Sequence, residues 1–76
     1  MTLREAEEWA RKHVHYVFGP THGKRGVTWI AQIRRESLLF ERRAVGEVRE
    51  RDALRSRAAD AVVRDYLEWV KRQLEH

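Results

Sequence analysis

The chain has 76 residues, a formal net charge of +4 and no cysteine. This length supports one domain, and the lack of cysteine excludes disulfides and thiolate metal sites and suits a reducing cytoplasm. No apolar run approaches the roughly 20 residues that span a bilayer, and the acidic N-terminal segment lacks the apolar core of a signal peptide. We therefore expect a cytoplasmic domain at residues 1–73, with residues 74–76 resembling the start of a histidine tag.

The first two predicted elements are a helix and a short strand. Thr2 and Glu5 have the spacing of a capping box, and the apolar residues that follow recur at helical spacing. These features predict a helix over residues 2–13. From residue 13 to residue 18 the repeat of apolar residues changes to every second position, which predicts a strand.

Two longer strands follow a glycine-rich segment at residues 18–26. Residues 27–34 and residues 38–45 both alternate in the period of a strand, and residues 35–37 supply a tight turn between them. Gly46 is expected to end the third strand. The glycine-rich segment is then a hairpin loop between the first and second strands.

The clearest element is a helix over residues 51–73, which contains no glycine or proline. Apolar residues cover about half of its circumference and must be buried, and the sheet is the only partner of sufficient area. Trp9, Trp29 and Trp69 fall on the predicted core faces. The predicted fold is α+β, with the order α-β-β-β-α: a three-stranded antiparallel meander with two helices packed on one face.

The hairpin loop and the start of the last helix carry the candidate ligand contacts. Glycines let a backbone approach its partner closely, and adjacent cations favour a phosphate-bearing one. Cations at a helix start oppose the helix dipole, which makes them better functional candidates than cations elsewhere. The candidate nucleic-acid contacts are His22, Lys24, Arg25, Arg51 and Arg55.

The order of elements and the loop sequence Gly19-Pro20-Thr21-His22 resemble the double-stranded-RNA-binding domain family. That family has this fold and a Gly-Pro-x-His motif in the same loop, and here an aromatic residue, Tyr16, precedes it. The family also has three basic residues before an alanine pair at the start of its last helix. Matching that pair to Ala58-Ala59 places the basic positions at Arg51, Asp52 and Arg55, of which the middle one is acidic.

The resemblance implies binding of duplex RNA by its shape. The first helix and the loop would meet the minor groove, and the cations of the last helix would meet the phosphates across the intervening major groove. Duplex DNA stays open as well, because a three-stranded sheet can enter a DNA major groove. Gln32 and Arg34, on the uncovered sheet face, are of the types that read bases.

Catalysis, cofactors and metals are not expected. Ser37 and Ser56 lack evident histidine and acid partners, and the loop lacks the spacing of a Walker A motif. His13, His15 and His22 have no acidic or cysteine ligand near them at metal-binding spacing. The leading hypothesis is a binding module and not an enzyme.

An alternative hypothesis is a protein-interaction or homodimerisation module without nucleic-acid binding. The second sheet face is predicted to carry Val17, Ile30 and Leu39, which is an apolar set for so small a domain. The same face of a second copy, or a partner protein, would cover these side chains.

Overall fold

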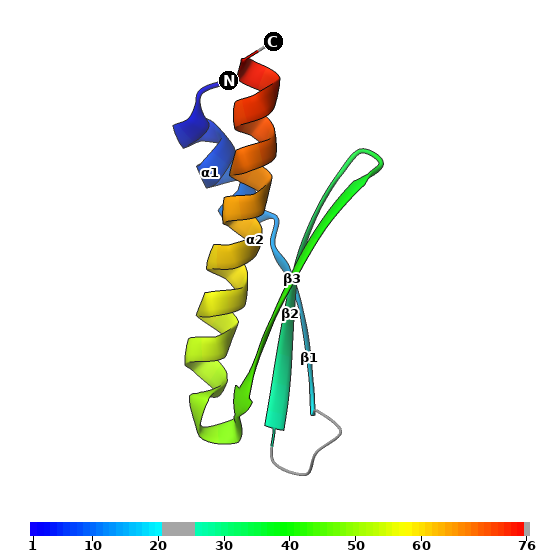
Figure 1. The fold of residues 1–76 in the computed structure, drawn as a ribbon, viewed down its shortest axis with the longest axis vertical. Coiled ribbons are helices and arrows are strands. Elements are labelled where there is room, and N and C mark those ends of the chain that lie inside the picture. The colour runs from blue at the N-terminus through cyan, green and yellow to red at the C-terminus, as the bar shows by residue number, and fades with distance from the viewer. Residues whose placement is uncertain (21–25, 76) are drawn as a thin grey trace.

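The computed structural model describes residues 1–20 and 26–75. The elements follow the order helix, three antiparallel strands, helix, and the sheet is a meander in the order β1-β2-β3 (Figure 1). The elements are α1 (Leu3–Lys12), β1 (His15–Pro20), β2 (Gly26–Arg35), β3 (Leu38–Glu47), the 3-10 turn η1 (Val48–Glu50) and α2 (Arg51–Leu74). The predicted fold class and strand arrangement are confirmed.

The predicted capping box starts α1. The Glu5 amide donates to the Thr2 hydroxyl at 3.1 Å, and the Thr2 amide donates to the Glu5 carboxylate at 3.0 Å. The Thr2 amide lowers the pKa of Glu5, because a donated hydrogen bond favours the charged carboxylate. His13 ends the helix, and its ring stacks on Trp9 with centroids 4.2 Å apart. The prediction that the first strand begins at residue 13 is therefore wrong, and β1 starts at His15.

Side chains of the sheet alternate between an inner face, turned to the helices, and an open face. Tyr16 and Phe18 of β1 pair with Ala31 and Trp29 of β2 on the inner face. Tyr16 and Trp29 pack against the buried core, and Ala31 is part of it. Because the side-chain period of a strand is two, the intervening residues lie on the open face. No described element covers the open face.

β3 is longer than predicted. It continues through Gly46 to Glu47, so the prediction that Gly46 ends the strand is wrong. A Cβ atom at Gly46 would lie 2.9 Å from Cδ1 of Leu54, a side chain of α2 with 0% exposure. Glycine at this position therefore allows β3 to pass close to the start of α2.

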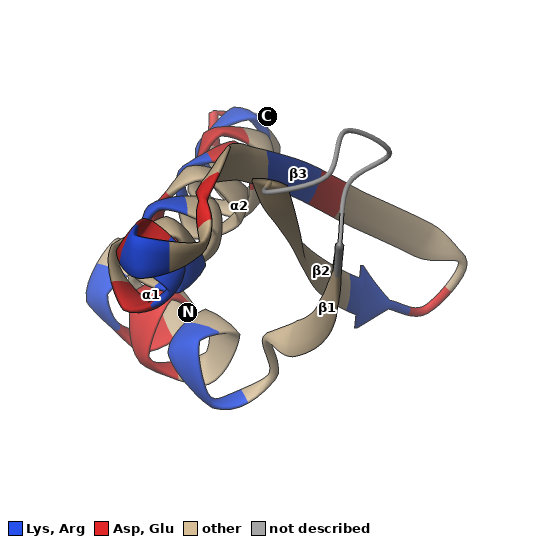
Figure 2. Cartoon of the chain, turned by 90° about the horizontal axis from the view of Figure 1, so that it is seen from below, with Lys and Arg blue, Asp and Glu red and all other residues tan. Residues whose placement is uncertain are grey.

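Both helices lie on the inner side of the sheet (Figures 1 and 2). α2 runs along β2 and β3, and α1 packs beside α2. Ala6 and Ala10 of α1 are completely buried, and their small side chains allow the two helices to approach closely. Arg11 of α1 also donates to Asp60 of α2 at 2.7 Å, and this hydrogen bond raises the pKa of the Arg11 guanidinium.

Tyr66 of α2 lies at the centre of an aromatic group. Its side chain is completely buried, and its ring centroid is 5.4 Å from that of Trp9, 5.5 Å from Phe40 and 6.1 Å from Trp69. The guanidinium of Arg35 donates to the Tyr66 hydroxyl. A side chain from each helix and from β2 and β3 therefore meets at this one ring.

Candidate nucleic-acid interface

Two segments distant in sequence meet at one end of the molecule. Pro20 of β1 pairs with Val27, and Gly26 of β2 pairs with Glu47 of β3. η1 then leads directly into α2, so the strand ends and the start of α2 share the lower end of Figure 1. We call this region, together with residues 21–25 that join the two strand ends, the basic end. The candidate contacts His22, Lys24 and Arg25 lie outside the described residues.

Arg55 is held at the basic end by aromatic rings. Its guanidinium carbon lies 4.0 Å from the ring centroid of Tyr16 and 5.8 Å from that of Trp29. Within the described residues it forms no ion pair with a carboxylate. Stacking fixes the plane of a guanidinium and leaves its N–H edge available for hydrogen bonds. Arg55 is therefore a positioned cation whose charge is not neutralised by a bound acid.

Arg51 lies one helical turn before Arg55, so the structure places these two predicted residues together. Its Nε atom is 3.9 Å from Oδ1 of Asp52, the acid that interrupts the basic motif. The Asp52 side chain is 98% exposed, and exposed pairs of this kind contribute little. Arg49 makes a shorter pair with Glu47, at 2.8 Å. Neighbouring acids therefore offset part of the charge at the helix start.

The basic end nevertheless holds most of the excess charge of the chain. Residues 47–57 contain four arginines and three acids, and residues 21–25 add Lys24 and Arg25 without an acid. Three of the four excess positive charges therefore belong to this region.

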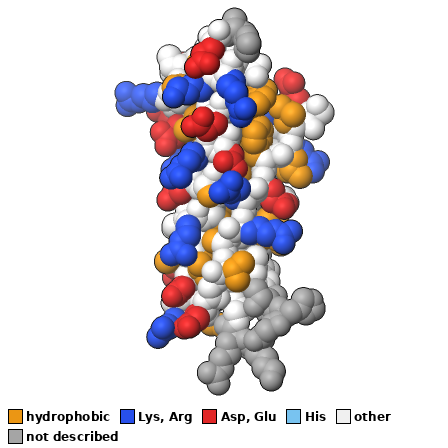
Figure 3. All heavy atoms as spheres, in the orientation of Figure 1, with side chains coloured by type: hydrophobic (Ala, Val, Ile, Leu, Met, Phe, Trp, Pro, Cys, Tyr) orange, Lys and Arg blue, Asp and Glu red, His pale blue; other side chains and the backbone are white. Residues whose placement is uncertain are grey.

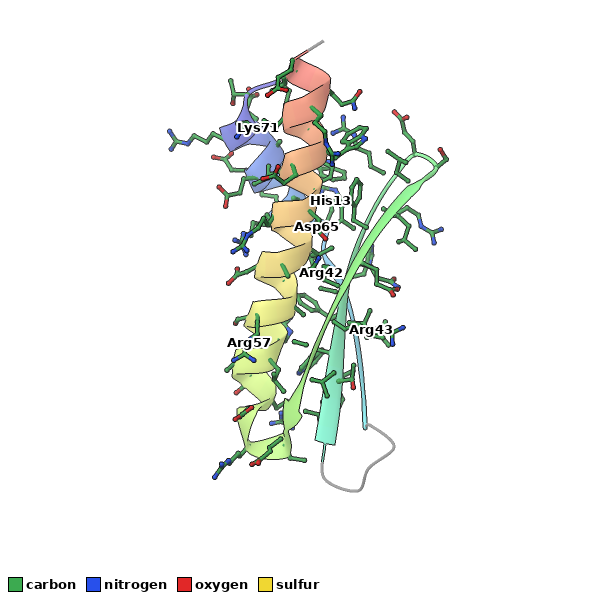
Figure 4. The ribbon with its side chains drawn as sticks, viewed as in Figure 1. His13, Arg42, Arg43, Arg57, Asp65 and Lys71 are labelled. Atoms are coloured by element: carbon green, nitrogen blue, oxygen red, sulfur yellow. The ribbon has the colours of Figure 1, made fainter. Side chains whose placement is uncertain are left out.

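Cations elsewhere on the helices and on β3 are interspersed with acids. Figure 3 shows both signs along the length of the molecule, and Figure 2 shows both signs on the helices and on β3. Arg42, on the inner side of β3, points to α2 and pairs with Asp65 at 3.2 Å (Figure 4). Arg43, the next residue, points away from α2 and lies 3.7 Å from Glu41. These pairs balance part of the local charge, and residues 34–43 still hold four arginines against two acids.

The three predicted partner-face residues lie on the open face. Val17 pairs with Ile30, and Leu39 pairs with Arg34 on the neighbouring strand. Val17 and Leu39 are 50% and 49% exposed. Val45, which the sequence prediction did not include, lies on the same face and is 60% exposed. The open face therefore carries one more apolar side chain than predicted.

A polar row crosses the open face between these apolar residues. His15, Gln32 and Glu41 lie side by side on the three strands, and Gln32 donates to Glu41 at 2.7 Å. The side-chain amide of Gln32, which was predicted to be able to read bases, thus already donates a hydrogen bond to Glu41. His13 stacks on Trp9 at the end of α1, so it does not continue the strand that contains His15.

No protein family, curated protein or solved structure matches this chain. The resemblance to double-stranded-RNA-binding domains therefore stays a prediction. Within residues 1–20 and 26–75, neither helix combines the length and the apolar content needed to cross a bilayer.

Two features of the site were not found from the sequence. One is the stack of Arg55 on Tyr16, which joins a helix start to a strand 39 positions earlier. The other is Phe18, which is 46% exposed on the inner side of β1. The sequence did hold a signal for the Arg55 stack: Arg55 precedes the buried Ala58 by three residues and so borders the apolar stripe of the helix.

Proposed function

We propose that this chain is a small nucleic-acid-binding module that contacts the phosphate backbone of duplex RNA or DNA. The contacts come from the basic end: the glycine-rich loop and the arginines at the start of α2. The observation that carries this proposal is the concentration there of three of the four excess positive charges. Phosphate contacts depend on charge and position and not on base sequence, so the binding is directed by shape.

The stack of Arg55 on Tyr16 supports the same proposal. A free arginine loses side-chain entropy when it binds a phosphate, whereas a stacked one has already lost part of it. The guanidinium is also more suited than an ammonium to bidentate recognition of phosphate. Tyr16 thus acts as a positioning residue for a phosphate-binding cation.

The test is a titration of generic duplex RNA and duplex DNA at several salt concentrations. If Lys24, Arg25, Arg51 and Arg55 each neutralise a phosphate, the logarithmic salt slope is about −3 to −4 on B-DNA. Raising salt from about 50 to about 200 mM is then expected to lower the affinity about 100-fold. Absence of binding to either duplex at the lower salt concentration would refute the proposal.

Self-association through the open face is a second candidate function. It is favoured by the three side chains that are about half exposed on that face, Val17, Leu39 and Val45. The face also carries both signs of charge, at Arg43 and Glu41. A two-fold axis passing between these two residues would set Arg43 of each copy opposite Glu41 of the other, as an isologous interface requires.

Val17→Lys is expected to convert such a dimer to a monomer, because it buries an unpaired charge at the interface. Sedimentation equilibrium over micromolar to millimolar protein measures the change. Val48→Lys, at an exposed position of η1, is the matched control and leaves the dimer intact. A monomeric wild-type protein throughout this range would exclude the dimer and leave the nucleic-acid proposal untouched.

A further inference from the structure

Phe18 is an aromatic side chain that the fold leaves partly uncovered. β1 is an edge strand, and α2 runs along β2 and β3 instead. α1 packs beside α2 and does not extend over β1. Phe18 therefore keeps 46% of its surface exposed although it points to the inner side of the sheet.

Neighbouring rings brace Phe18 and connect it to the positioned arginine. The Phe18 and Trp29 ring centroids lie 4.7 Å apart with an angle of 46° between the ring planes. The same Trp29 ring has Tyr16 edge-on at 6.0 Å and the Arg55 guanidinium at 5.8 Å. Phe18 is also two residues from Pro20, where β1 reaches the basic end. An open aromatic ring and an unneutralised cation thus flank one tryptophan.

This pairing of chemistries fits a nucleotide with an unpaired base. An exposed aromatic ring stacks on the π-face of any base, and a nearby guanidinium takes the adjoining phosphate. A base inside a duplex is already stacked on both sides and cannot use such a ring. We propose that Phe18 stacks on an unpaired base beside a phosphate held by Arg55 at the start of α2. The preferred ligand is then a nucleic acid with a single-stranded extension. This inference rests on the proposed function.

Charge at the basic end favours a nucleic acid over an apolar protein segment as the occupant. The Arg55 guanidinium lies 5.8 Å from the same Trp29 ring that contacts Phe18, and Arg51 lies one helical turn before Arg55. An apolar peptide would cover Phe18 but would leave these charges without counterions. A polyanion with exposed bases can stack a base on the Phe18 ring and also place its phosphates against the cations.

The experiment compares a blunt duplex with the same duplex carrying a short single-stranded overhang. Fluorescence anisotropy gives the affinity of each for the wild-type protein, Phe18→Ala, Phe18→Leu and Phe18→Tyr. We expect the wild-type protein to bind the overhang about 10-fold more tightly, the range typical of one base stacked on an aromatic ring. The preference should vanish in Phe18→Ala and in Phe18→Leu, which keeps apolar volume without a π-face, and should persist in Phe18→Tyr.

Leu38→Ala is the matched control, since Leu38 is also partly exposed, at 39%, and lies at the opposite end of the sheet, where it pairs with Arg35. It should keep the overhang preference. Equal binding of blunt and overhanging duplexes by the wild-type protein overturns the stacking inference and leaves the proposed function standing. Persistence of the overhang preference in Phe18→Ala also overturns the stacking inference and leaves the proposed function standing. Failure to bind any nucleic acid overturns both.

Discussion

Replacing Tyr66 by alanine is expected to lower the free energy of unfolding by about 3–5 kcal/mol, the usual range for removing a large buried aromatic side chain. The substitution leaves a cavity between α1, α2 and the sheet, because Trp9, Phe40 and Trp69 all pack around this ring. Domains of this size have little stability in reserve. The variant should therefore be largely unfolded at room temperature. Urea titration followed by circular dichroism measures the loss.

Tyr66→Phe separates the contribution of the ring to stability from that of the hydroxyl. It keeps the ring packing and removes only the hydrogen bond from Arg35, so we expect a loss of about 1 kcal/mol. Arg35 also lies over the Trp9 ring, with its guanidinium carbon 5.2 Å from the centroid, and that contact survives the substitution. Should the alanine variant prove as stable as the phenylalanine variant, the ring would not be the centre of the core.

The prediction of the elements succeeded because each has a strong local period. The two helices and the alternating strands were recognisable from apolar spacing alone, and the sheet faces followed from the period of two. The prediction failed where a tertiary contact decides the local structure. Gly46 is typical of a strand end, but here it admits the side chain of Leu54. Leu54 itself was not predicted as core because it stands among charged residues at the start of the helix.

The candidate site was predictable in composition and not in geometry. The sequence identified Arg51 and Arg55 as unusual cations at a helix start, and the structure places them one turn apart. The sequence could not show that Arg55 stacks on Tyr16, because that contact depends on the register between β1 and β2 and on the path of η1. Phe18 was missed for a related reason: its exposure follows from the position of α2 over β2 and β3, which no local pattern encodes.

Reversing the charge of Arg51 and Arg55 together is expected to weaken nucleic-acid binding by about 100-fold at low salt, the product of two charge-assisted contacts of moderate strength. It should also reduce the magnitude of the logarithmic salt slope by about 2, because two phosphates are no longer neutralised. The variant is Arg51→Glu with Arg55→Glu, and the measurement is the same salt-dependent titration of duplex RNA and DNA. Both readouts have to change together if the two arginines contact phosphate directly.

The matched control is Arg64→Glu with Lys71→Glu, which changes the net charge equally but lies further along α2, where acids and cations alternate. A general effect of net charge would weaken binding equally in both double variants and would contradict a localised site. Arg55→Glu also removes the stack on Tyr16, so Arg55→Gln with Arg51→Gln is measured beside it. The glutamine pair removes the charge without adding repulsion. It should reduce the salt slope by the same amount while losing less affinity, because the slope counts released counterions and the affinity also includes the repulsion.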